Sequence, residues 1–254
     1  MVPEWPTREG VASRAMDEPP ASERTARPAA AACEVHVGRI HDLRAAHLTM
    51  LNDAELARAR QYRRADDSDR CLLGAVLLRM VAARHLGVLP GDVAVDRTCD
   101  HCGAQHGRPQ LPGSDLHASV THSGDVVAVA LTPAGPVGVD VEAGRPIDFS
   151  AVTDSVCTRA ERACVTGLDD FYAFWTRKEA VLKATGEGLS RPMTDLHVTP
   201  PGTAPVLLSL GSDAAPACRM ADISAGDGYH AAVAVLTARP VAFTIHDTAT
   251  LLAS

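Results

Sequence analysis

Two carboxylates spaced two residues apart form the clearest chemical signal in this sequence. Asp140 and Glu142 lie in the segment Gly-Val-Asp-Val-Glu at 138–142. In a β-strand, residues two apart project from the same face, so both carboxylates would point one way while the valines face a core. Such oxygen ligands suit Mg²⁺, which binds one or two carboxylates and keeps waters or phosphate oxygens as its other ligands. Alternating valine and acid is also typical of a half-exposed strand without a metal.

A second signal lies in a segment with helical periodicity. Trp175, Glu179 and Lys183 are spaced four residues apart, which places them on one helix face. An acid followed four residues later by a lysine is typical of a surface salt bridge worth about 0.2–0.5 kcal/mol. The tryptophan indicates that this face is partly covered, where an ion pair needs a further reason to be present. A surface pair and a functional face both remain open.

Basic and histidine side chains near strand ends are candidates for phosphate binding. His122 follows Thr121 between two expected strands, and Arg108 precedes Pro109 a little earlier. These side chains can hold a phosphate through charge-assisted hydrogen bonds, although a lone histidine at a strand end is more often structural. Arginines also gather at positions 58, 60, 63, 64 and 70. This segment is either a solvated helix face or a phosphate site.

A cysteine pair suggests a weaker metal hypothesis. Cys99 and Cys102, with His101 between them, resemble half of a zinc site. A tetrahedral zinc site needs four ligands, and no second cysteine pair at suitable spacing follows. A loop with reduced thiols is the alternative.

The composition of the whole chain excludes several functional classes. The formal net charge of the 254 residues is −7, which argues against binding to a nucleic acid backbone. No apolar run approaches the roughly 20 residues of a membrane-spanning helix. The N-terminus lacks the pattern of an export signal, and the seven cysteines are odd in number and scattered, unlike a secreted disulfide framework. We therefore expect a cytoplasmic protein with reduced thiols that binds neither nucleic acid nor membranes.

The pattern of elements predicts an α+β fold. Residues 1–32 are rich in proline, alanine and charge and predict a disordered tail. We expect helices from about residue 52 and over 71–86, 158–165 and 170–185. Strands are expected at 33–40, 93–95, 118–121, 126–131, 137–141, 196–198, 206–210, 230–236 and 241–245. Strands and helices do not alternate regularly, which favours α+β over a doubly wound sheet.

An internal similarity predicts two related halves. Residues 124–132 and 228–237 share a glycine followed by alternating alanine and valine and a final threonine. We divide the chain into an N-terminal half at 33–135 and a C-terminal half at 136–254. The hydrophobic content of 46% is sufficient for a core.

Taken together and in this order, the motifs resemble the Sfp-type 4'-phosphopantetheinyl transferases. The resemblance spans about residues 34–236. Its core is the segment at 138–142 followed by Trp175-x-x-Lys178-Glu179-x-x-x-Lys183, and supporting matches lie at 70–74, 106–109 and 121–124.

The resemblance implies two α+β halves related by pseudo-twofold symmetry, with coenzyme A and Mg²⁺, or Mn²⁺, in the cleft between them. It implies a monomer that transfers the 4'-phosphopantetheine arm of coenzyme A to a serine of an apo acyl or peptidyl carrier protein and releases 3',5'-ADP. The pathway would be polyketide, nonribosomal peptide or fatty acid synthesis.

The resemblance also assigns roles to residues. Asp140, Glu142 and Glu179 match metal ligands, Lys183 matches the lysine that meets the pyrophosphate, and Asp140, Glu179 and Lys183 form the implied catalytic set. Glu179 is the candidate base for the serine hydroxyl. The implied coenzyme A site consists of Arg70, Arg108 and His122 on the 3'-phosphate and adenine side, Pro109 and Thr121 along the pocket, Lys183, and Arg58. Arg58 stands where the family has a lysine, and a second family lysine falls on Glu55.

Three other functions compete with this interpretation. A non-catalytic coenzyme A binding module of the same fold should have lost at least one of the residues Asp140, Glu142, Glu179 and Lys183, and none is missing here. A metal-dependent pyrophosphate hydrolase would release free phosphopantetheine without a carrier. A zinc-dependent nucleic-acid module would contain stoichiometric zinc.

Overall fold

The computed structural model describes residues 30–99 and 102–253. Most of the tail expected at 1–32 lies outside the described residues, as does His101. The first strand begins at Ala31, earlier than the expected start at Cys33.

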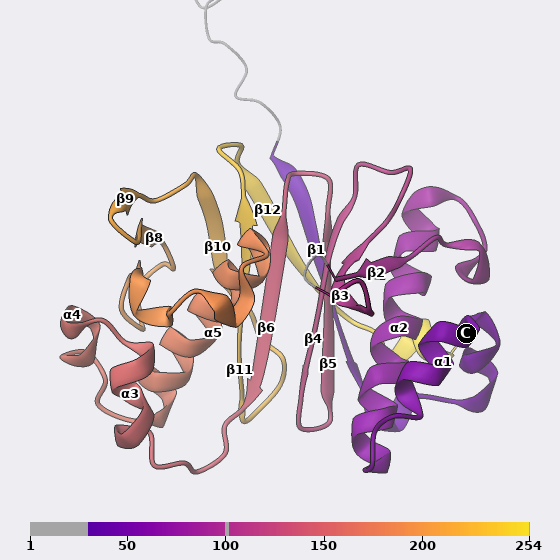
Figure 1. The fold of residues 1–254 in the computed structure, drawn as a ribbon, viewed down its shortest axis with the longest axis horizontal. Coiled ribbons are helices and arrows are strands. Elements are labelled where there is room, and N and C mark those ends of the chain that lie inside the picture. Colours follow the sequence, from indigo (N-terminus) through magenta and orange to yellow (C-terminus); the bar gives the residue numbers. More distant parts are fainter. Residues whose placement is uncertain (1–29, 100–101, 254) are drawn as a thin grey trace, which may run out of the picture.

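The largest sheet is formed mainly by strands of the N-terminal half. Its six strands run in the order β12-β1-β5-β4-β3-β2. β1 is parallel to β12 and antiparallel to β5. The strands are β1 (Ala31–Arg39), β2 (Asp96–Thr98), β3 (Gln105–Gln110), β4 (His117–Ser123), β5 (Val126–Thr132) and β12 (Val241–Asp247). Helix α2 (Ala65–Leu86) packs on one face of this sheet (Figure 1).

A second sheet of three strands carries the long helix of the other half. Its antiparallel order is β10-β11-β6, with β6 (Val137–Ala143), β10 (Cys218–Asp222) and β11 (Tyr229–Leu236). Helix α5 (Leu168–Thr185) packs against β6 and β11. A small third sheet consists of β7 (Leu196–Val198), β8 (Leu207–Leu210) and β9 (Asp213–Ala214).

The remaining elements are short. The α-helices are α1 (Asp53–Ala59), α3 (Ser150–Val156), α4 (Arg159–Arg162) and α6 (Ala249–Ala253). Turns of 3₁₀-helix occur at Ile40–Asp42, Ala45–Met50, Pro90–Asp92, Gly188–Ser190 and Met193–Asp195.

The two halves have matching topology. The strand order β1-β5-β4 corresponds to β6-β11-β10, and in each half a long helix, α2 or α5, follows the first strand and precedes the other two. The repeated segments found in the sequence are the turn and strand of β5 and of β11, which hold the central position in each trio. The predicted α+β class with two related halves is therefore confirmed.

The two sheets pack face to face, with a helix on the outer face of each. Figure 1 shows α2 on one side, α5 on the other, and β1 and β6 in the layers between them. One apolar cluster lies between the sheets and includes Val35, Ala128, Val139 and Val233. Each helix has its own cluster against its sheet. Because alternate residues of a strand face opposite sides, the outward residues of β1 meet α2 while the inward ones meet the second sheet.

The end of the chain returns to the first half. β12 pairs with β1, and Leu252 of α6 belongs to the cluster under α2. Residues 241–253 therefore lie with the first sheet, although the sequence division at 136 assigns them to the C-terminal half.

Some expected element boundaries agree with the structure and others do not, such as the start of α2, which lies at Ala65 and not at residue 71. α1 begins after Asn52 as expected, and Asn52 forms a capping box with Glu55. The expected end of α2 is also correct, because Gly87 takes the left-handed conformation at φ 67° that commonly ends a helix. The strand expected at 93–95 is wrong. A guanidinium nitrogen of Arg79 donates to the carbonyls of Pro90, Gly91 and Val93, which holds this segment as a loop.

Gly138 allows α5 to approach β6 closely. A Cβ at this position would overlap the carbonyl oxygen of Ala180 and lie 2.6 Å from the amide nitrogen of Ala184. Because both atoms belong to a helix backbone, the helix itself would have to move. We expect Gly138→Ala to lower the thermal unfolding temperature by about 5 °C, as overpacking of roughly 1–3 kcal/mol implies for a chain of this size.

The matched control is Gly91→Ala. A Cβ at Gly91 would lie 4.0 Å from the backbone of Met50, an ordinary contact, and the unfolding temperature should stay nearly unchanged. Equal unfolding temperatures for the two variants would contradict the close approach at Gly138.

Candidate functional site

The expected acidic strand and the expected helix face meet at the junction of the two halves. β6 buries Asp140, which is 3% exposed, and presents Glu142 on the same side. α5 crosses this strand and brings Lys183 to Asp140, with 2.6 Å between Lys Nζ and Asp Oδ1. Among the described residues Lys183 therefore pairs with Asp140 and not with Glu179. The surface salt bridge between Glu179 and Lys183, one of the two alternatives, does not form.

Hydroxyl side chains of β4 connect the first half to these acids. Thr121 Oγ1 donates to Asp140 Oδ1 at 3.2 Å and accepts from Lys183 Nζ at 3.0 Å. Ser123 Oγ donates to Glu142 Oε2 at 2.8 Å and accepts from the backbone of β6. Ser119 also accepts from this backbone. The sequence analysis gave Ser119 and Ser123 no role in this site, although the alternation of hydroxyl residues at 119, 121 and 123 is the available signal.

The acids of the site are electrostatically unfavourable without a cation. Burial raises the pKa of Asp140, and the Lys183 ammonium only partly offsets this effect. Burial likewise raises the pKa of Glu142 and of Glu179, and the charge of Asp140 raises both further. Desolvated, mutually repelling carboxylates are a common arrangement at metal sites.

One oxygen of this set lacks a partner. Asp140 Oδ2 is buried and has no hydrogen-bond partner among the described residues. A buried unsatisfied carboxylate oxygen costs free energy unless a ligand completes it. Asp140, Glu142 and Glu179 are hard oxygen donors, so they fit a divalent cation such as Mg²⁺. Their ligand atoms do not all lie within 4.8 Å of one another, so binding requires a rotation of at least one side chain.

Positive groups extend from these acids toward α2. His122, on β4, has its pKa lowered by desolvation and by the charges of Arg70 and Lys183, which indicates that the three side chains share one region. Arg70 donates to the carbonyl of Gly124 and to Asp67. A cavity of about 420 Å³ lies beside Arg70. Arg64, Arg70 and Arg145 line this cavity together with three carboxylates, whereas His122 and Lys183 do not line it.

The other predicted anion-binding residues lie apart from Arg70. A guanidinium nitrogen of Arg108 donates to the carbonyl of Ala184 at 3.1 Å, near the end of α5. Arg108 and Pro109 line a different cavity, of about 220 Å³.

Arg58 contacts the thiol of Cys71 at 3.3 Å. Burial and the charge of Arg58 lower the pKa of Arg97 to about 10. Arg97 is thus a cation near Arg58 that sequence reasoning missed.

A neighbouring lysine of the same motif is structural. Lys178 is fully buried and its Nζ donates to Glu161 at 2.5 Å, to Val156 O at 2.7 Å and to Met193 O at 3.1 Å. The two lysines of the α5 motif therefore have different roles. Lys178 points into the core of its half, and Lys183 points toward Asp140.

No helix among the described residues is long and apolar enough to cross a membrane.

Comparisons with known proteins give a consistent result. The family model described as the 4'-phosphopantetheinyl transferase superfamily matches residues 136–234. The chain is 26% identical over 193 residues to 4'-phosphopantetheinyl transferase Sfp of Bacillus subtilis strain 168, covering 73% of this chain and 82% of the relative. It is 30% identical over 219 residues to 4'-phosphopantetheinyl transferase HetI of Nostoc sp., covering 80% and 87%. It is 32% identical over 198 residues to 4'-phosphopantetheinyl transferase psf-1 of Bacillus pumilus, covering 73% and 78%.

Proposed function

This chain belongs to the 4'-phosphopantetheinyl transferase superfamily, and on that premise we propose that it transfers the 4'-phosphopantetheine arm of coenzyme A to a serine of an apo acyl or peptidyl carrier protein. The observation that carries this proposal is the buried Asp140, which pairs with Lys183 through one oxygen and has no partner for the other. A carboxylate held in this way beside a lysine suits a site that binds a cation and a pyrophosphate together.

We assign the cation to the acids of the site. Asp140, Glu142 and Glu179 would hold Mg²⁺, or Mn²⁺, since both accept carboxylate oxygens. When bound, the cation would offset negative charge on the pyrophosphate of coenzyme A.

The chain's own residues supply the remaining chemistry. The serine Oγ of the carrier forms a bond to the β-phosphorus of coenzyme A while the bond from that phosphorus to 3',5'-ADP breaks, and 3',5'-ADP leaves. Lys183 stabilises the charge that develops on the leaving group. Thr121 keeps Lys183 in place through its hydroxyl, at 3.0 Å.

Arg70 and His122 are assigned to the 3'-phosphate of coenzyme A. Both adjoin the positive region that leads to Lys183, so a phosphate held there would orient the pyrophosphate toward Asp140. Arg108 is assigned, with Arg70 and His122, to the 3'-phosphate and adenine side of the substrate. Pro109 and Thr121 are assigned to the same pocket, and Arg58 to the position where the family has a lysine.

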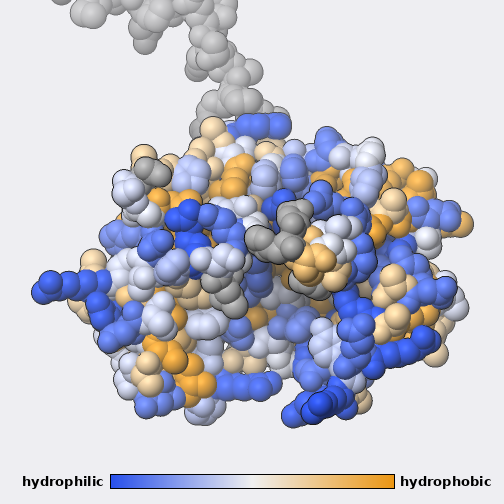
Figure 2. Space-filling view, in the orientation of Figure 1, coloured by the Kyte–Doolittle hydropathy of each residue, from blue (hydrophilic) through white to orange (hydrophobic). Residues whose placement is uncertain are grey.

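We propose that electrostatic attraction helps this protein to recognise the carrier. Carrier proteins are acidic helical bundles, and the arginines that precede and open α2 offer positive charge in an acidic chain. Figure 2 shows hydrophilic side chains over much of the face seen in Figure 1, with hydrophobic ones in separate groups. We further propose that the protein acts as a cytoplasmic monomer.

Glu179 is assigned as the base that accepts the serine proton, directly or through a water. We expect Glu179→Gln to lower kcat by at least about a hundredfold, the usual contribution of a positioned base. Glu187→Gln is the control, because Glu187 pairs with Arg191 beyond the end of α5. Full turnover by Glu179→Gln protein in saturating Mg²⁺ would exclude Glu179 as the base.

The test of the function is intact-mass spectrometry of an apo carrier protein incubated with this protein, coenzyme A and Mg²⁺. We expect the carrier to gain the mass of one phosphopantetheine arm, and the gain to disappear without metal. Coenzyme A binding without any gain across several carriers would instead support a non-catalytic binding module. Free phosphopantetheine formed without a carrier would support a hydrolase.

A further inference from the structure

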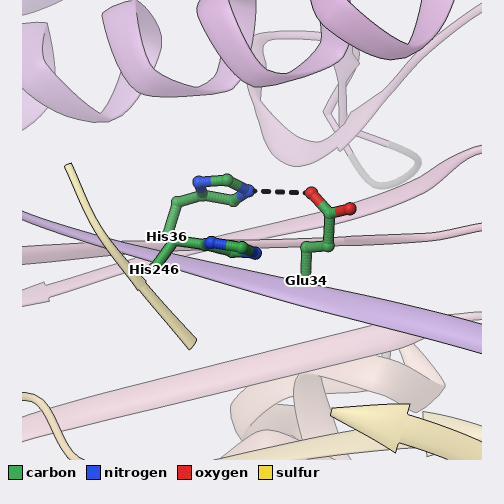
Figure 3. A group of neighbouring side chains, drawn as sticks. All are labelled: Glu34, His36 and His246. Atoms are coloured by element: carbon green, nitrogen blue, oxygen red, sulfur yellow. Dashed lines mark hydrogen bonds and ion pairs between the residues drawn. The ribbon is translucent and has the colours of Figure 1, made fainter. Parts of the chain in front are cut away.

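A cluster of histidines and a carboxylate lies outside the site described above. Glu34 and His36 come from β1, and His246 comes from β12, where it is the register partner of His36. The two imidazole rings stack, with 4.7 Å between ring centroids and an interplanar angle of 17°. Figure 3 shows the three side chains together, with an imidazole directed at the Glu34 carboxylate.

A third histidine approaches the same carboxylate from α2. Glu34 Oε2 lies 3.1 Å from His36 Nε2 and 3.2 Å from His85 Nε2. A ligand atom from each of Glu34, His36 and His246 lies within 4.8 Å of the other two. In the part of the chain that the structure describes, this is the one set of three or more acidic, histidine or cysteine ligands gathered so closely.

One nitrogen of the cluster lacks a protein partner. His246 Nε2 is buried and has no hydrogen-bond partner among the described residues. His36 is itself only 3% exposed. A buried ring nitrogen without a donor is costly in a core but is the form in which histidine binds a metal.

We propose that Glu34, His36 and His246 bind a divalent transition-metal ion of the zinc class, with His85 as the fourth ligand. Imidazole nitrogens combined with one carboxylate oxygen suit Zn²⁺ and disfavour Mg²⁺, which prefers oxygen ligands. Zinc to nitrogen distances of about 2.0–2.1 Å put two tetrahedral ligand atoms about 3.3 Å apart. The separations of 3.1 and 3.2 Å around Glu34 match this spacing. His85 does not lie within 4.8 Å of all three other ligand atoms, so it must rotate to complete the set.

The site is separate from the catalytic acids. Gly38, on the same face of β1 as Glu34 and His36, lies against Leu77 of α2, whereas Val35 faces the second sheet that carries Asp140. β12 is an edge strand that pairs with β1 within the larger sheet. An ion held by β1, β12 and α2 would fasten this edge strand to the sheet and the helix, so its role is structural.

The test is a zinc titration of untagged full-length protein freed of metal by a chelator, with excess Mg²⁺ present to occupy the catalytic acids. Calorimetry and elemental analysis should give one zinc per chain. Zinc at about a hundred times its dissociation constant should raise the unfolding temperature by roughly 5 °C.

Two variants and one control make the test specific. His246→Phe keeps a ring stacked on His36 but has no ligand atom, and Glu34→Gln keeps the shape of the half-buried acid. Each should weaken zinc binding by at least about tenfold. Loss of an outer-shell partner alone weakens metal binding by about 10–100-fold, so loss of a direct ligand should have no smaller effect. His41→Gln replaces an exposed histidine and should bind zinc like the unmodified protein.

Three results would overturn the proposal. The first is the absence of stoichiometric binding at micromolar zinc. The second is unchanged affinity in both His246→Phe and Glu34→Gln proteins. The third is zinc fully retained by folded His246→Phe protein, which would assign the ion elsewhere, with Cys99 and Cys102 as the next candidates.

Discussion

Replacing Asp140 with asparagine is expected to lower kcat/KM for carrier modification at least about a thousandfold while the protein stays folded. The substitution removes the carboxylate assigned to the cation and the acceptor of the Lys183 ammonium, and loss of such stabilisation of developing charge costs several kcal/mol. Asparagine keeps the shape of the side chain, and Lys183 is 28% exposed, so its charge can turn toward solvent. Intact-mass measurement of initial rates at several coenzyme A concentrations checks the effect.

The same substitution should raise the stability of the metal-free protein, although it lowers the activity. Because burial raises the pKa of Asp140 above its value in the unfolded chain, the folded state binds the proton more tightly than the unfolded state does. The free energy of unfolding of the metal-free protein therefore falls as pH rises from the unfolded pKa to the folded pKa. Asparagine removes this loss, so the variant should become progressively more stable than the unmodified protein as pH rises over that range.

Thermal unfolding in a chelator across this pH range measures the stability effect. Asp169→Asn is the control, because the Asp169 side chain is 94% exposed at the start of α5. This variant should match the unmodified protein both in its rate of carrier modification and in its stability across the pH range. An Asp140→Asn protein that modifies carriers at the normal rate would refute the assigned role of Asp140. A stability difference independent of pH would instead show that this carboxylate is not desolvated.

Local patterns in the sequence were sufficient to predict the elements of the site. The alternation at 138–142 gives the strand β6, and the spacing of Glu179 and Lys183 gives one face of α5, because side-chain direction follows from the period of each element. Asn52 and Gly87 mark helix ends by their own backbone preferences. These features depend on residues that are close in the chain.

Contacts between distant segments could not be predicted in this way. The pairing of His36 with His246 depends on the register of β1 against β12, which joins the two ends of the described chain. Similarly, the helical period of α5 does not predict that Lys178 pairs with Glu161 in the core, because Glu161 belongs to the separate helix α4. The choice of Asp140 as the partner of Lys183 also required the close approach of α5 to β6 at Gly138.

Two lysines of α5 should respond to the same substitution in opposite ways. Lys178→Met leaves Glu161, which is 2% exposed, without its cation, and breaking a buried ion pair costs about 3–5 kcal/mol. We expect the unfolding temperature to fall by roughly 10 °C, with carrier modification retained at temperatures where the protein is folded. Lys183→Met should instead abolish most of the turnover and lower the unfolding temperature by less than Lys178→Met does. Asp140 is also buried, but its pKa is already raised by burial, so it takes up a proton more readily once Lys183 is gone.

The matched pair is informative because each variant serves as the control for the other. Scanning calorimetry and single-temperature rate measurements on both proteins separate loss of folding from loss of chemistry. Adding Glu161→Gln to Lys178→Met should restore part of the stability, since it removes the charge left unpaired in the core. Folded Lys178→Met protein without activity would mean that the core pair also fixes the position of Glu179, the next residue along the helix. A stable and fully active Lys183→Met protein would remove Lys183 from the proposed mechanism.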